Sequence, residues 1–108
     1  MNKTVILIVS FLLYYPTIYS QNFIKGIVVN GNSEKPLLNV VVRVKNTIIT
    51  AKTTIKGVFQ IKDLANGTYI LEIKFNGFET QNFPVELSSN TIDLGTIFLF
   101  EDMVEEQD

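Results

Sequence analysis

The sequence contains no cysteine, no histidine and no tryptophan among its 108 residues. Without cysteine, the chain cannot form a disulfide, a thiolate metal site or a cysteine nucleophile. Without histidine, it lacks the most common general base and the most common metal ligand of proteins. The net charge of −2 is small and of the wrong sign for general binding to nucleic acid. We therefore expect a protein that is not an enzyme, holds no cofactor or metal and binds no nucleic acid.

The first twenty residues have the layout of a secretory signal peptide. Lys3 provides the positive start, residues 5–15 form an apolar run, Pro16 ends any helix, and Ser20 supplies a small residue before the expected cleavage point. The apolar run is shorter than the about 20 residues that a membrane span needs. We expect residues 1–20 to be removed on export, and an uncleaved N-terminal anchor is the alternative.

Residues 21–100 alternate short apolar runs with turn signals at intervals of roughly 8–12 residues, which is typical of an all-β sandwich or barrel. No stretch of ten residues keeps a helical apolar period, so no helix is expected after residue 20. The seven expected strands cover residues 23–30, 38–45, 48–54, 58–62, 69–75, 78–87 and 92–100.

The second expected strand shows how the two faces differ. Val40, Val42 and Val44 share one side of it, and the cationic Arg43 and Lys45 share the other. A β-branched face and a charged face indicate a strand that is buried on one side only.

Three positions predict local irregularities. Asn76-Gly77 is a typical two-residue hairpin turn. Pro84 lacks the N–H that a central strand needs, so residues 78–87 are expected at a sheet edge or with a bulge. Gly95 is expected to mark a bulge in the last strand.

The last eight residues, 101–108, form an acidic segment. We expect it to be a solvated tail or linker, because such a segment has no apolar face to bury. Calcium binding is an alternative, but the spacing lacks the glycine of an EF-hand loop. The five acids are Glu101, Asp102, Glu105, Glu106 and Asp108.

Several motifs follow one another in a fixed order. They are residues 34–40 (EKPLLNV), 42–47 (VRVKNT), 54–61 (TIKGVFQI), 64–71 (LANGTYIL) and Gly77-Phe78. In this order they resemble the G-x-P-L-x-G-A, V-x-V-K-G-T, D-x-x-G-x-F-x-I, L-P-P-G-x-Y-x-L and Gly-Tyr segments of the carboxypeptidase regulatory-like domain. The resemblance implies that residues 21–100 form a seven-strand antiparallel Greek-key β-sandwich of the transthyretin type, preceded by the signal-peptide helix. It implies a scaffold that carries no catalytic residue.

The chain departs from the family pattern at a few positions. Asn39 and Asn46 stand where the family has Gly, Thr54 stands where it has Asp, and Ala65-Asn66 replaces Pro-Pro. Asn tolerates a positive φ better than other non-glycine residues, so the first two positions are expected to keep the turn geometry. The hydroxyl of Thr54 is expected to replace the turn hydrogen bond of Asp.

The family resemblance also suggests a context. Such domains follow the signal peptide of many TonB-dependent outer-membrane receptors, ahead of the plug and barrel. This implies a non-catalytic accessory domain in the periplasm or outer membrane of a Gram-negative cell, or at the cell surface. The expected partner is a receptor plug or barrel or another envelope protein, with a membrane reached only through the signal peptide or a barrel outside this chain. The alternative is a free-standing secreted module for adhesion or glycan binding, and the oligomeric state is left open.

The candidate partner surface is aromatic. We expect Phe83, Phe98 and Phe100 to stay partly exposed, and an exposed aromatic patch marks a partner surface. Unpaired edge strands also permit the addition of a partner strand.

Two covalent modifications are alternatives. Related pilin-type sandwiches carry Lys–Asn isopeptide bonds, and Lys25, Asn90 and Glu72 could imitate that trio, although Lys25 is expected to face solvent. Residues 66–68 match a glycosylation sequon, but a hairpin loop is the simpler interpretation.

Overall fold

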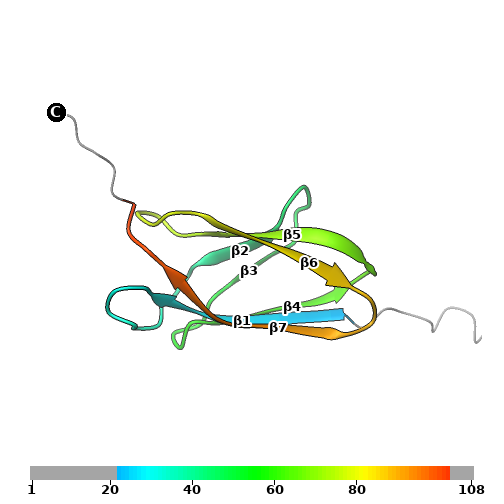
Figure 1. Cartoon of the computed structure of the whole chain (residues 1–108), viewed down its shortest axis with the longest axis horizontal. Coiled ribbons are helices and arrows are strands. Elements are labelled where there is room, and N and C mark those ends of the chain that lie inside the picture. The colour runs from blue at the N-terminus through cyan, green and yellow to red at the C-terminus, as the bar shows by residue number, and fades with distance from the viewer. Residues whose placement is uncertain (1–21, 103–108) are drawn as a thin grey trace, which may run out of the picture.

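The computed structural model describes residues 22–102, which form a sandwich of two β-sheets (Figure 1). One sheet has three strands in the order β4-β1-β7, and the other has four in the order β3-β2-β5-β6. The strands are β1 (Asn22–Asn30), β2 (Val41–Val44), β3 (Thr50–Lys52), β4 (Val58–Leu64), β5 (Gly67–Lys74), β6 (Gln81–Leu87) and β7 (Thr91–Leu99).

The predicted all-β sandwich of seven strands is confirmed. The expected signal-peptide helix falls in residues 1–20, which lie outside the described residues. Between residues 22 and 102 there is no helix, and hence none that could cross a membrane.

The pairing of β1 with β7 is parallel, whereas the other four strand pairs are antiparallel. The expectation of a fully antiparallel sandwich is therefore wrong for this one pair. The chain leaves β6 at the end of the sandwich where β1 begins, so it enters the three-stranded sheet in the same direction as β1. A two-residue apolar alternation reveals which face of a strand is buried, but it does not reveal the direction of the neighbouring strand.

The sixth strand begins later than expected, at Gln81 rather than at Phe78. The backbone around Phe78 pairs instead with the chain just beyond β7. Phe78 and Glu101 form an antiparallel bridge, and the Glu79 N–H donates to the Phe100 carbonyl at 2.9 Å. The segment between β5 and β6 is therefore longer than a two-residue hairpin, and it is tied to the other sheet.

The core lies between the inner faces of the two sheets. The predicted inward face of residues 38–45, which include β2, is confirmed, because Val40, Val42 and Val44 are fully buried. Burial of a large aliphatic or aromatic side chain contributes about 1.5–3 kcal/mol. The buried cluster consists of Ile24, Val28, Val40, Val42, Val44, Phe59, Ile61, Leu64, Leu71, Ile73, Val85, Leu87, Ile97 and Leu99.

Asparagine and threonine shape turns at positions where the resembled family has glycine and aspartate. Asn39 and Asn46 have φ values of 69° and 66°, which confirms that asparagine replaces glycine there in the left-handed region. The Thr54 Oγ1 accepts hydrogen bonds from the backbone N–H groups of Lys56 at 3.2 Å and Val58 at 3.3 Å. The predicted substitution of an aspartate by a threonine hydroxyl is thus confirmed.

Gly57 occupies the most restricted of these turns. Its φ is 78°, and a Cβ atom there would lie 2.5 Å from the backbone carbonyl oxygen of Val28. The same glycine accepts a hydrogen bond from the Val28 N–H at 2.8 Å, so the turn after β3 is fixed onto β1. Gly77 has a φ of 89°, but no atom lies within 4 Å of the position of its Cβ.

These two glycines give a matched pair of substitutions. Gly77→Ala should lower the free energy of unfolding by about 1 kcal/mol, because only the left-handed backbone is strained. Gly57→Ala should cost at least about 1 kcal/mol more, because the new methyl group also displaces the Val28 carbonyl. Urea denaturation of the two variants checks this, and equal losses would contradict it.

Candidate functional site

The three phenylalanines of the predicted patch do not lie together. Phe83 is on β6, where it pairs with Leu71 and packs against the core. Phe98 and Phe100 lie at the end of β7, on the outer side of the three-stranded sheet, and are 45% and 44% exposed. Phe83 shares its inward face with Val85, which is buried. The structure thus leaves Phe98 and Phe100 as surface residues and places Phe83 apart from them.

A bulge at Gly95 sets the orientation of Phe98. Asp93 pairs with Lys25 of β1, and the next pair along the two strands is Thr96 with Ile27. β7 therefore spans three residues where β1 spans two, and the backbone of Gly95 in between is left-handed, with a φ of 71°. Leu94 packs against the core, so an unbroken alternation would turn Phe98 inward as well. The extra residue inverts the faces, so Ile97 is buried and Phe98 is exposed. The predicted bulge is confirmed, and it creates the aromatic surface.

Ile27 on β1 completes an outer apolar patch, which we define as Ile27, Phe98 and Phe100. Ile27 is 39% exposed and faces outward, because its neighbour Val28 is fully buried. It pairs with Thr96, and Phe98 lies two residues further along β7, on the same face, where it pairs with Val29. The alternation of the first strand contained the signal for Ile27, but the prediction considered aromatic residues alone.

The ring of Phe100 lies over Gly31, so close that a Cβ atom at position 31 would clash with it. The Gly31 N–H also donates to the Leu99 carbonyl at 2.7 Å. Gly31 thus lets the loop after β1 approach the end of β7, and it provides the floor on which the Phe100 ring rests.

Charged residues border the patch on the same face. Lys25 on β1 is in register with Asp93 on β7 and with Gln60 on β4. A shallow hollow of about 310 Å³ lies between the polar row and the patch, and Ile27 and Val58 line its apolar side. This face therefore combines a flat apolar area with a polar border, as protein interfaces do.

The isopeptide hypothesis fails on geometry. Lys25 is exposed on the outer face of the three-stranded sheet, as predicted. Glu72 is on β5 in the other sheet, where it pairs with Arg43 at 2.9 Å. The Asn90 side chain accepts a hydrogen bond from the Ser88 N–H at 2.9 Å in the loop before β7. Glu72 therefore lies on the other sheet from Lys25, so the trio that the isopeptide reaction needs is not assembled.

A buried asparagine fixes the end of the sandwich where β1 begins. The Asn22 side chain is 1% exposed; it donates to the Leu64 carbonyl at 2.6 Å and to the Asn66 Oδ1 at 3.0 Å. It accepts from the Asn90 N–H at 3.0 Å, and the Asn66 Oδ1 accepts from the Ser89 N–H at 2.8 Å. The sequon asparagine therefore belongs to a structural network. Its turn joins β4 to β5 between the two sheets, so it is not a hairpin loop.

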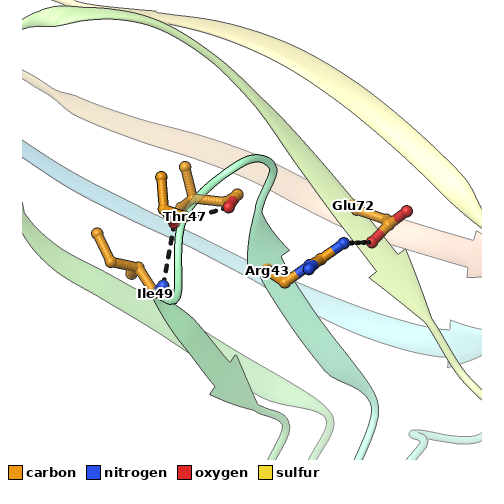
Figure 2. A network of polar contacts seen from close by, with 5 residues as sticks. Arg43, Thr47, Ile49 and Glu72 are labelled. Carbon is orange, nitrogen blue, oxygen red and sulfur yellow. Dashed lines mark hydrogen bonds and ion pairs between the residues drawn. The ribbon is translucent and has the colours of Figure 1, made fainter.

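The outer face of the four-stranded sheet is cationic. Arg43 on β2 and Glu72 on β5 lie side by side and form an ion pair (Figure 2). The hydrogen bond from Arg43 lowers the pKa of Glu72, and the charges of Arg43, Lys74 and Lys45 lower it further. At the nearby turn, the Thr47 Oγ1 accepts from the Ile49 N–H at 3.0 Å, also seen in Figure 2.

The lowered pKa of Glu72 predicts a pH dependence. The ionised pair stabilises the folded state above the ordinary pKa of glutamate, and this contribution disappears as the pH falls through the lowered folded-state pKa. Glu72→Gln should therefore have a lower Tm than the native protein at neutral pH, and the difference should shrink on acidification. Glu86→Gln is the control, since Glu86 has no ion pair among residues 22–102. A Tm difference for Glu72→Gln that does not change with pH would contradict the prediction.

Residues 24–107 match the model of the CarboxypepD_reg-like domain. The chain belongs to this family. The resemblance inferred from the motifs is thereby confirmed, and a search of curated proteins finds no match. Within residues 22–102, no three acidic side chains come together as a potential metal site.

Solved structures share the fold. A chain of a type II cohesin–X-dockerin complex from Acetivibrio cellulolyticus matches with 22% identity and a TM-score of 0.62, over 74% of this chain and 58% of that one. The group B streptococcus pilus 2b backbone protein matches with 16% identity and a TM-score of 0.57, over 75% and 41%. The minor pilin GBS52 of Streptococcus agalactiae matches with 19% identity and a TM-score of 0.54, over 84% and 49%. The chain thus spans about half the length of these structures.

Proposed function

We propose that this protein is a non-catalytic accessory domain of an exported protein, and that it binds a protein partner through the outer apolar patch. The observation that carries the proposal is the exposure of Phe98, Phe100 and Ile27 on one flat sheet face. The bulge at Gly95 holds Phe98 on this face, where an unbroken strand would bury it. Aromatic anchors surrounded by a polar border are the usual centre of a protein interface.

We further propose that the domain is the N-terminal extension of a TonB-dependent outer-membrane receptor for nutrient uptake. The signal-peptide layout of residues 1–20 and the family membership of residues 24–107 support this context. Figure 1 shows that β1 begins at one end of the sandwich and that β7 ends at the other, so the domain suits an in-line position in a longer chain.

A free-standing module for adhesion or glycan binding is the second candidate. It is favoured by an open hollow of about 650 Å³ at the end of the sandwich where β7 ends. The rings of Phe75 and Phe78 lie 5.5 Å apart beside it, and Asn39 and Asn76 are among its lining residues. Aromatic rings with nearby amides suit a sugar ring, whose faces are apolar and whose edge carries hydroxyl groups.

The patch is tested with the double variant Phe98→Ser/Phe100→Ser. Both rings are about half exposed, so the variant should stay folded and lose no more than about 2 kcal/mol of stability. It should bind the partner at least about tenfold more weakly, because aromatic anchors dominate interfaces. Ile48→Ser is the matched control, because Ile48 is 96% exposed and lies outside the patch.

The partner is obtained by photo-crosslinking in cells, with a benzophenone amino acid at position 98 or at position 48. An adduct from position 98 that is absent from position 48 supports the patch. Equal adducts from both positions, or unchanged binding by the double variant, would show that the outer apolar patch does not bind the partner.

The receptor context is tested by the size and location of the native gene product. An antibody against residues 21–100 is used on blots of fractionated cells. A large band in the outer membrane is the expected result. A band near the size of residues 21–108 in the periplasm or medium would instead favour the free-standing module.

A further inference from the structure

β7 has one side without a strand partner among residues 22–102. It pairs with β1 and lies at the edge of the three-stranded sheet. The Leu99 carbonyl faces β1, where it accepts from the Gly31 N–H at 2.7 Å, and the Phe100 carbonyl faces the other side, where it accepts from the Glu79 N–H at 2.9 Å. Because successive residues of a strand alternate between its two sides, Phe98 and Thr96 direct their backbone groups to the open side.

A short piece of an additional strand already lies on this open side. Residues 77–79 run antiparallel to the chain beyond β7, with the bridge between Phe78 and Glu101 and a hydrogen bond of 2.8 Å from the Asp102 N–H to the Gly77 carbonyl. The chain then leaves for β6 in the other sheet. Residues 77–79 thus pair only with the chain beyond β7. No described residue pairs with the open side of β7 at Thr96 and Phe98.

The other three edges are protected. β3 has only three residues, and β6 contains Pro84, which cannot donate a backbone hydrogen bond. On β4, the Val58 carbonyl is engaged by the Thr54 N–H at 2.9 Å, and the strand carries Lys62. β7 contains no lysine, arginine or proline. The bulge interrupts the edge in its first half, where the Gly95 N–H donates to the Asp93 side chain at 2.8 Å. The Phe100 carbonyl is already bonded to the Glu79 N–H, so residues 96–99 form the accessible edge.

The chemistry along this edge identifies the occupant. The ionisable side chains at the end of this edge are all acidic: Glu79, Glu101 and Asp102. The apolar patch residues Phe98 and Phe100 face outward beside it. A second copy of the domain is a poor occupant, because two acidic edges would be opposed. A partner segment with alternating basic and apolar residues matches both features.

We propose that residues 96–99 of β7 accept an extended basic-apolar segment of a partner protein, which adds to the three-stranded sheet as an antiparallel strand. The inference rests on the proposed interaction function and specifies its mode. Main-chain hydrogen bonds to Thr96 and Phe98 would supply affinity, and contacts of the apolar side chains with the outer apolar patch would supply selectivity.

The test uses the mature chain, labelled with ¹⁵N, and a capped peptide of alternating lysine and valine. Amide hydrogen exchange of Thr96 and Phe98 should slow by about tenfold or more when the peptide is present, because their N–H groups become hydrogen-bonded. The N–H groups of Gln60 and Lys62 on the opposite edge are the internal control and should not change. The same peptide with alternate backbone nitrogens methylated should lose the effect, although its side chains are unchanged.

The charge component is tested separately. Glu101→Gln/Asp102→Asn should weaken the peptide several-fold, whereas Glu72→Gln on the other sheet should leave the affinity unchanged. Equal weakening by both variants would show that Glu101 and Asp102 do not attract the peptide specifically.

The outcomes separate strand addition from the proposed function. Binding without slower exchange at Thr96 and Phe98, or equal binding of the methylated peptide, overturns strand addition and leaves the patch as a side-chain interface. No binding of the peptide at millimolar concentration also overturns it. The crosslinking experiment with the native partner then decides the interaction function independently.

Discussion

The packing of the two sheets against each other is the interaction on which this domain depends. With no cysteine in the chain, no disulfide can supplement it. Val42 of β2 and Leu71 of β5 are fully buried on one inner face, and Ile24 of β1 is fully buried on the other. Every turn must therefore orient the next strand so that its apolar face points toward the core. The left-handed residues, including Asn39 and Gly57, perform this task.

The same constraint explains the surface of the domain. β7 changes its inward face in the middle, because the bulge at Gly95 inserts one residue into the alternation. The second half can then bury Ile97 and Leu99, and Phe98 must turn toward solvent. The exposed ring is thus a consequence of the register that the core requires. Phe98 also lies beside the open edge of β7, which is why both features enter the proposed mode of binding.

Much of this architecture could be predicted from the sequence, because alternation and turn residues are local signals. The seven strands, the edge position of Pro84 and the bulge at Gly95 follow from such signals. The parallel pairing of β1 and β7 and the late start of β6 depend on contacts between distant segments. Phe83 is partly exposed, as expected, but it lies in the other sheet from Phe98. Which sheet a strand joins depends on distant contacts, so the separation of the three rings could not be predicted locally.

The acidic segment has a more definite position than its composition suggested. Its first two residues are held to residues 77–79: Glu101 by a bridge with Phe78, and Asp102 by a backbone hydrogen bond to Gly77. Backbone pairing does not depend on side-chain polarity, which is why composition alone could not show it. The consequence is that negative charge, exposed aromatic rings and unpaired backbone groups meet at one corner of the domain. The proposed basic-apolar segment would match each of these three features: lysines the charge, apolar side chains the rings, and its backbone the open strand edge.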